Sequence, residues 1–167
     1  PLPVLGKDPS IVLFLERPSL PGIEQLTHEE LKLAGLRINP QLWSASRSYY
    51  YSGLYLRVND AHISISGLPA NAKIAHVSLS PDRERFAFTH TTMDGVELWV
   101  GDFESATVHC LHQGPLNDVT GGGPFRWMPD SQQLLIRLVP ENIGLPPAKP
   151  QVPTGPIIQE NQGKKSP

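Results

Sequence analysis

The chain has 167 residues, 39% of them hydrophobic, with 14 basic and 16 acidic side chains. This length is typical of a single domain, and the near balance of charge argues against a nucleic-acid partner or a polybasic membrane anchor. One cysteine excludes an internal disulfide framework, and no apolar run approaches the roughly 20 residues of a membrane helix. The 18 prolines and 14 glycines predict short strands and many turns.

The first predicted unit is a sheet with a long interruption. Turn residues at 7–10 precede an apolar strand at 11–17, and the runs GLYLRV (53–58) and HISIS (62–66) lie further along the chain. We expect the three runs to be the second, third and fourth strands of one unit at approximately 1–66.

Residues 18–51 interrupt this unit and contain a helix-like pattern. In GIEQLTHEELKLAGL, Thr27 can cap the run that follows, and Glu30 completes a capping-box pattern three residues later. Gly35 is a natural stop for a helix. We therefore expect a short helix near 28–34.

Residues 73–112 contain four short apolar bursts separated by turn residues, which predict one complete antiparallel meander. The strands are expected at 73–79, 85–91, 96–102 and 107–111. Strict alternation would place Ile74 and His76 on one face of the first strand, and Phe86 and Phe88 on one face of the second.

The pattern of the first two strands returns in PFRWMPDSQQLLIRL at 124–138. Pro81-Asp82 corresponds to Pro129-Asp130, and each aspartate is expected to close a turn. The offset between these pairs is 129 − 81 = 48 positions, which fits the roughly 40–50 residues of one propeller blade.

A single meander leaves an apolar face in water, and stacking like units face to face covers it. We therefore predict an all-β fold, a partial β-propeller of about two and a half four-stranded antiparallel blades with one short helical insertion. The propeller segment would span 1–139, with blades at approximately 1–66, 73–112 and 124–139 onward. Residues 140–167 hold seven of the 18 prolines and are expected to form a loop or a disordered tail.

Several segments resemble the N-terminal propeller of the prolyl oligopeptidase family of serine peptidases, in the branch that contains the glutamyl endopeptidases. They are LPGIEQLTHEELKLAGLRINP (20–40), YYYSGLYL (49–56), VSLSPDRERFAFT (77–89), VELWVGDFES (96–105), FRWMPDSQQLLI (125–136) and PPAKPQVPTGPIIQENQGKKSP (146–167). The SPD pattern occurs in many propellers, whereas KLAGLRINP and KPxVPTGP are much more specific to this branch.

The resemblance implies an enzyme in which a propeller caps a C-terminal α/β-hydrolase domain with a Ser-Asp-His triad and restricts peptide access to it. The G-x-S-x-G motif of such a serine is absent from the sequence, so no catalytic residue is assigned to this chain. The expected partners are the remainder of its own polypeptide and a peptide substrate, with no cofactor. The alternative is a non-enzymatic propeller that binds other proteins, and the compartment stays open between periplasmic, secreted and organellar.

An aromatic and basic cluster at 43–51 is the candidate substrate-contacting surface. Arg37 or Arg47 could pair with a carboxylate in bidentate fashion, and Tyr50 lies beside them in sequence. Packing around the expected helix, with ordinary surface arginines, is the alternative explanation of the same residues.

The segment His109-Cys110-Leu111-His112 does not predict a metal site. On a strand, residues 109 and 112 point to opposite faces, which leaves only Cys110 and His112 on one side. A tetrahedral zinc site needs more protein ligands than two, so no metal is expected. The glycine run at 121–123 is interpreted as a loop between blades, because neither a helix nor a lysine follows it.

Overall fold

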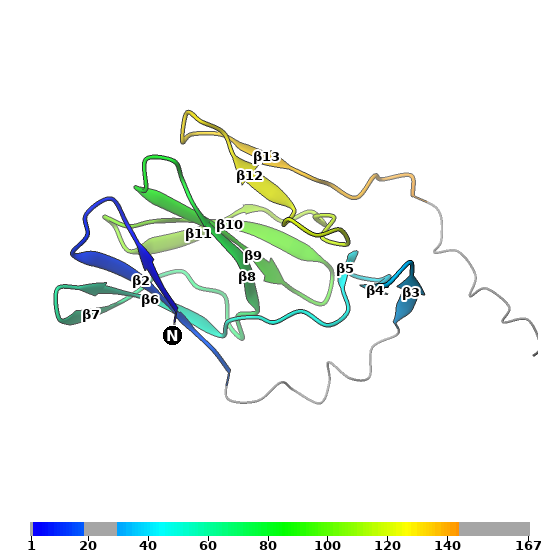
Figure 1. The fold of residues 1–167 in the computed structure, drawn as a ribbon, viewed down its shortest axis with the longest axis horizontal. Helices are drawn as coiled ribbons and strands as arrows, with labels where there is room; N and C mark the ends of the chain where they lie inside the picture. Colours follow the sequence, from blue (N-terminus) through cyan, green and yellow to red (C-terminus); the bar gives the residue numbers. More distant parts are fainter. Residues whose placement is uncertain (1, 19–29, 144–167) are drawn as a thin grey trace, which may run out of the picture.

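The computed structural model describes residues 2–18 and 30–143, and every regular element in them is a β-strand. The strands are β1 (Leu2–Leu5), β2 (Ile11–Glu16), β3 (Leu31–Leu33), β4 (Leu36–Asn39), β5 (Ser44–Ala45), β6 (Gly53–Val58), β7 (Ala61–Ser64), β8 (Ile74–Leu79), β9 (Arg85–Thr91), β10 (Val96–Asp102), β11 (Thr107–His112), β12 (Phe125–Trp127) and β13 (Leu134–Ile136). They form four antiparallel sheets (Figure 1). The predicted all-β class is confirmed. Within the described ranges there is no apolar helix long enough to cross a membrane.

The first sheet has the strand order β1-β2-β6-β7, so the residues between β2 and β6 are inserted into it. Its pairing sets Leu13 opposite Leu56 and Leu15 opposite Leu54. Because directly opposed residues share a face, these four leucines form one apolar surface. Each of them is at most 4% exposed, and together they make the first sheet's half of a core.

The central sheet, with the order β11-β10-β9-β8, is apolar on both faces. Phe86 and Phe88 of β9 are completely buried in the core shared with the first sheet. Val96 and Leu98 of β10 point the other way, into a second core that includes Trp127 of β12. Antiparallel sheets commonly leave one face in water. Because both faces of this sheet are apolar, it needs a neighbouring sheet on each side.

The third sheet consists of β12 and β13 and covers the second face of the central sheet. The indole Nε1 of Trp127 donates a hydrogen bond to the backbone oxygen of Ser78 at 3.2 Å, which links β12 to β8. Figure 1 shows the first, central and third sheets stacked in this order. The stacking of like antiparallel sheets matches the expected partial propeller.

Corresponding turns of adjacent sheets also contact one another. The backbone N–H of Lys7 donates to the carbonyl of Arg83 at 3.0 Å, and the backbone N–H of Asp82 donates to Oγ of Ser131 at 3.0 Å. Asp82 and Asp130 each accept a backbone N–H from two residues further on, so both close their turns as the sequence predicts. The turns between the first two strands of the first, central and third sheets therefore form a row.

The predicted helix near 28–34 is wrong for the part that the structure describes. Residues 31–39 form a hairpin in which Leu31 pairs with Ile38 and Leu33 with Leu36. Its turn residues, Ala34 and Gly35, have φ values of 47° and 85°, the positive values of a primed two-residue hairpin turn. The glycine interpreted as a helix stop therefore belongs to a hairpin turn. Residues 28 and 29, like Thr27, lie outside the described residues.

The predicted alternation in β8 also fails, at His76. The register between β8 and β9 shifts between Ala75 and Ser78, and His76 has a φ of 51°. A bulge inserts a residue and redirects the side chains that follow it. Ile74 is therefore completely buried whereas His76 is exposed.

A loop or a disordered tail is the prediction for residues 140–167. The structure describes residues 140–143 of this range, which contain no strand, and residues 144–167 lie outside the described residues.

The close approach of β10 to the Phe86 ring generates a stability prediction. A Cβ built on Gly101 would overlap the Phe86 ring, which is completely buried and cannot move aside freely. We expect Gly101→Ala to lower the free energy of unfolding by about 1–3 kcal/mol through overpacking. Denaturant unfolding followed by tryptophan fluorescence measures this change.

Gly121→Ala is the matched control, because a Cβ at that position has no neighbour within 4 Å. Its effect should stay within about 0.5 kcal/mol. Equal effects of the two substitutions would contradict the packing described for β9 and β10.

Candidate functional site

The predicted substrate-contacting residues lie on and just after the inserted sheet, which has the order β3-β4-β5. Arg37 is on β4, and Arg47 and Tyr50 follow β5. The structure brings the two arginines together, but on a carboxylate of the same chain, Glu30. Tyr50 is half-buried and takes no part in the described bonds of this cluster.

The Glu30 carboxylate contacts three side chains, two of them through hydrogen bonds. Nη1 of Arg37 lies 3.0 Å from Oε2, Nε of Arg47 lies 3.4 Å from Oε1, and Oγ of Ser46 donates to Oε1 at 2.7 Å. The Glu30 side chain is only 17% exposed, whereas those of Arg37 and Arg47 are 46% and 61% exposed. The cluster therefore ties the β3–β4 hairpin to the segment after β5, with the arginines on its outer side.

The hydrogen bond from Ser46 is the main cause that lowers the pKa of Glu30, and the charges of Arg37 and Arg47 act in the same direction against the opposing effect of desolvation. A carboxylate whose pKa is lowered on folding stabilises the folded state above the pKa of the unfolded chain. That contribution is lost as the pH falls through the lower pKa of the folded state. The cluster should therefore hold at neutral pH and loosen in acid.

A second cluster, absent from the sequence predictions, joins three parts of the chain. His76 Nε2 lies 2.9 Å from Asp118 Oδ2, and the backbone N–H of Asp118 donates to the carbonyl of Trp43 at 2.8 Å. The Asp118 side chain is 12% exposed and that of His76 is 34% exposed. This pair fastens the inserted sheet to β8 through the loop before β12. Sequence alone gives no signal for it, because the partners are far apart in the chain and His76 sits in a bulge.

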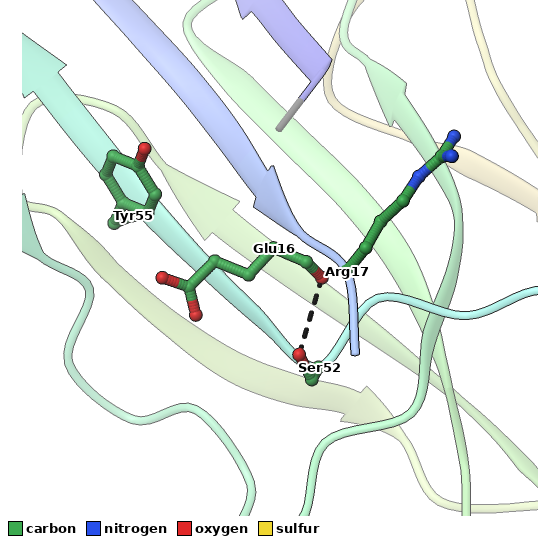
Figure 2. Close-up of a pocket in the computed structure, with 4 residues that line it drawn as sticks. All are labelled: Glu16, Arg17, Ser52 and Tyr55. Carbon is green, nitrogen blue, oxygen red and sulfur yellow. Dashed lines mark hydrogen bonds between the residues drawn. The ribbon is translucent and has the colours of Figure 1, made fainter. Parts of the chain in front are cut away.

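An open pocket of about 360 Å³ lies at the end of β2 and the start of β6, and Figure 2 shows four residues that line it. It is lined by Glu16, Arg17, Ser52 and Tyr55. The backbone N–H of Ser52 donates to the backbone oxygen of Glu16 at 2.8 Å. The hydroxyl of Ser52 donates to the same oxygen at 3.5 Å. The Arg17 guanidinium points out of the pocket, over the ring of Tyr51 at 5.9 Å. Among the described residues that line it, no nucleophile is paired with a base.

The described residues contain no group of three or more His, Cys, Asp or Glu side chains that could hold a metal ion. Cys110 Sγ lies 3.7 Å from the backbone oxygen of Leu98. Burial raises the pKa of this thiol, which disfavours the reactive thiolate. Residues 109–112 belong to β11 of the central sheet.

The Ser46 hydrogen bond generates a prediction about acid stability. We expect Ser46→Ala to raise the pKa of Glu30, because it removes the largest stabilising contact of the carboxylate. A carbon-detected NMR titration of the glutamate carboxyl groups would measure it. Ser48→Ala is the control, since Ser48 is exposed and close in sequence. An unchanged Glu30 pKa in Ser46→Ala would refute the assigned cause.

Comparison with known proteins finds two relatives that are named as glutamyl endopeptidases. No protein-family model matches it. It is 35% identical over 179 aligned positions to "Probable glutamyl endopeptidase, chloroplastic" of Oryza sativa subsp. japonica, with 97% of this chain covered. It is 33% identical over 180 positions to the protein of the same name from Arabidopsis thaliana, with 98% covered. The chain spans only 19% and 18% of the lengths of these two relatives, so it corresponds to one segment of them.

Proposed function

From its homology to one segment of the glutamyl endopeptidases, a branch of the prolyl oligopeptidase family, we propose that this chain is part of the N-terminal propeller of a serine peptidase. In this proposal the propeller admits peptides and unfolded segments to a C-terminal α/β-hydrolase domain and keeps folded proteins out. The nucleophile, base and acid lie in that other domain. This chain contributes a wall of the entry path.

The observation that carries the proposal is the match of nearly the whole chain to about a fifth of each relative. The sheet stacking supports it. The central sheet is buried on both faces, whereas the third sheet has only two described strands. A complete four-stranded blade in that position needs further strands, which a longer polypeptide would supply.

Arg37 and Arg47 are the residues that we propose to contact an acidic side chain of the substrate, and Tyr50 is a further candidate contact. Both relatives are named for glutamyl cleavage, which requires a cationic partner for the substrate carboxylate. Glu30 uses Nη1 of Arg37 and Nε of Arg47. A guanidinium group has five N–H donors, so each arginine retains donors for a second carboxylate.

The overall proposal predicts a division of activity between this chain and the whole protein. The whole protein should hydrolyse peptides and unfolded chains but leave folded proteins intact, and a serine-directed phosphonate should abolish the reaction. The isolated 167-residue chain should show no turnover of peptidyl esters. A whole protein that lacks G-x-S-x-G and hydrolyses nothing would instead support the protein-binding scaffold.

The proposed substrate contact predicts a change in specificity. In the whole protein, Arg47→Ala should lower kcat/KM for a peptide with a glutamate at the cleavage site by about tenfold, since a charge-assisted hydrogen bond contributes about 1.5 kcal/mol or more. The glutamine analogue of the peptide should be affected much less. Steady-state kinetics on the two peptides measures the ratio.

Arg126→Ala is the control, because Arg126 is an exposed arginine on the third sheet, away from the inserted sheet. An equal loss for both peptides in Arg47→Ala would indicate a structural role for this arginine and would contradict the substrate contact.

A further inference from the structure

The inserted sheet is connected to the stack of the first, central and third sheets without apolar packing. Among the described residues, none from β3, β4 or β5 belongs to either apolar core. In Figure 1 these strands lie at the side of the stack rather than between its sheets. Because the packing that joins the other sheets does not extend to it, polar contacts fix where the inserted sheet lies.

Asp118 makes two of these polar contacts, one with its backbone and one with its side chain. Its backbone N–H donates to the carbonyl of Trp43 at 2.8 Å, and it forms a parallel bridge with Ser44 of β5. Its carboxylate Oδ2 lies 2.9 Å from Nε2 of His76 on β8. Asp118 is therefore the joint at which the inserted sheet meets the central sheet.

A bulge in β8 directs His76 toward this joint. Two residues of β8, His76 and Val77, stand opposite the single residue Phe88 of β9. His76 has a φ of 51°, a left-handed value that costs free energy for a residue other than glycine. Strict alternation along β8 would point this side chain into the core. The strained backbone instead brings the imidazole to the Asp118 carboxylate.

The neighbouring glycine loop allows the imidazole ring its place. A Cβ built on Gly123 would lie only 3.2 Å from Nδ1 of His76. Gly123 has a φ of 74°, and its carbonyl accepts a hydrogen bond from the guanidinium of Arg137. The ring therefore contacts Asp118 through Nε2 and lies close to the loop at Nδ1, which restricts how far it can turn away.

We infer that His76 and Asp118 are positioning residues, a pair that sets the place of the inserted sheet and, through it, of Arg37 and Arg47. Arg37 lies on β4, which pairs with β5, and Arg47 follows β5. The Glu30 carboxylate contacts both guanidinium groups, so a displaced inserted sheet moves them together. This inference rests on the proposed function, in which the two arginines contact an acidic side chain of the substrate.

Hydrogen exchange in the whole native protein tests the joint. His76→Gly removes the imidazole but keeps the bulge, because glycine adopts a positive φ readily. We expect the Asp118 amide, resolved by mass spectrometry with electron-transfer fragmentation, to exchange at least fivefold faster in this variant. The amides of Leu116 and Asn117 donate to carbonyl groups outside the inserted sheet. Their rates should stay within twofold of those in the unchanged protein.

His109→Gly is the matched control, because His109 is an exposed histidine of β11 and the change of residue is the same. It should leave the Asp118 rate within twofold. An Asp118 rate that stays within twofold in His76→Gly would overturn the inference. Equal acceleration of the Leu116, Asn117 and Asp118 amides would also overturn it, because the whole loop would then have opened.

Steady-state kinetics of the whole protein tests the positioning of the arginines. His76→Gly should raise KM for a peptide with a glutamate at the cleavage site about fivefold and leave kcat within twofold, because it weakens binding and not the chemical step. KM for the glutamine analogue should stay within twofold. Asp118→Asn keeps the backbone N–H and an acceptor oxygen but loses the charge, so its KM should lie between those of His76→Gly and the unchanged protein.

The two measurements separate this inference from the proposed function. Faster exchange at Asp118 in an active peptidase whose KM for the glutamyl peptide is unchanged rejects the positioning role and leaves the proposed function standing. A whole protein that hydrolyses no peptide rejects the proposed function and the positioning of substrate contacts with it. Faster exchange at Asp118 in that protein still supports the pair as the attachment of the inserted sheet.

Discussion

The structure depends on the burial of the central sheet on both of its faces. Phe86 and Phe88 on one side, and Val96 and Leu98 on the other, are at most 1% exposed. Removing one such phenylalanine side chain typically costs about 3–5 kcal/mol, which is a large part of the stability of a domain. This sheet cannot fold alone in water with both faces exposed, so sheets must associate in a row. The proposed propeller is the closed form of that row.

Polar groups fix how the sheets meet, because apolar packing by itself has little directionality. The bond from Trp127 to the Ser78 carbonyl sets the position of β12 against β8. The bond from Asp82 to Ser131 aligns the turns of the central and third sheets. The inserted sheet, which carries candidate substrate-contacting residues, is attached to the central sheet through the pair of His76 and Asp118. The scaffold and the candidate substrate-contacting residues thus depend on different interactions.

Sequence patterns predicted the strands of the central sheet well because local rules govern them. The limits of β9 and β10 match the expected ranges, and Phe86 and Phe88 share a buried face. The sequence pattern predicted a helix where the inserted hairpin lies, because over so short a run the leucines at 31, 33 and 36 fit both the helical period and the strand period. The positive φ of Ala34, which decides between them, leaves no mark in the sequence.

The candidate site was less predictable than the fold. Arg37 and Arg47 were recognisable as carboxylate-binding residues, but their partner Glu30 was assigned to a capping box. The bulge at His76 and its bond to Asp118 depend on tertiary contacts between distant segments. Such contacts follow from the fold rather than from local propensity.

The stack has two interfaces, the first between the first and central sheets and the second between the central and third sheets, and different kinds of hydrogen bond hold them. The first and central sheets share main-chain hydrogen bonds, from Tyr51 to Ile74 and from Val108 to Ser66, in addition to their core. The central and third sheets are joined along their strands and turns by side-chain bonds, with one main-chain bond from the loop at Leu116 to Val96. The second interface therefore has fewer main-chain hydrogen bonds to resist shear than the first.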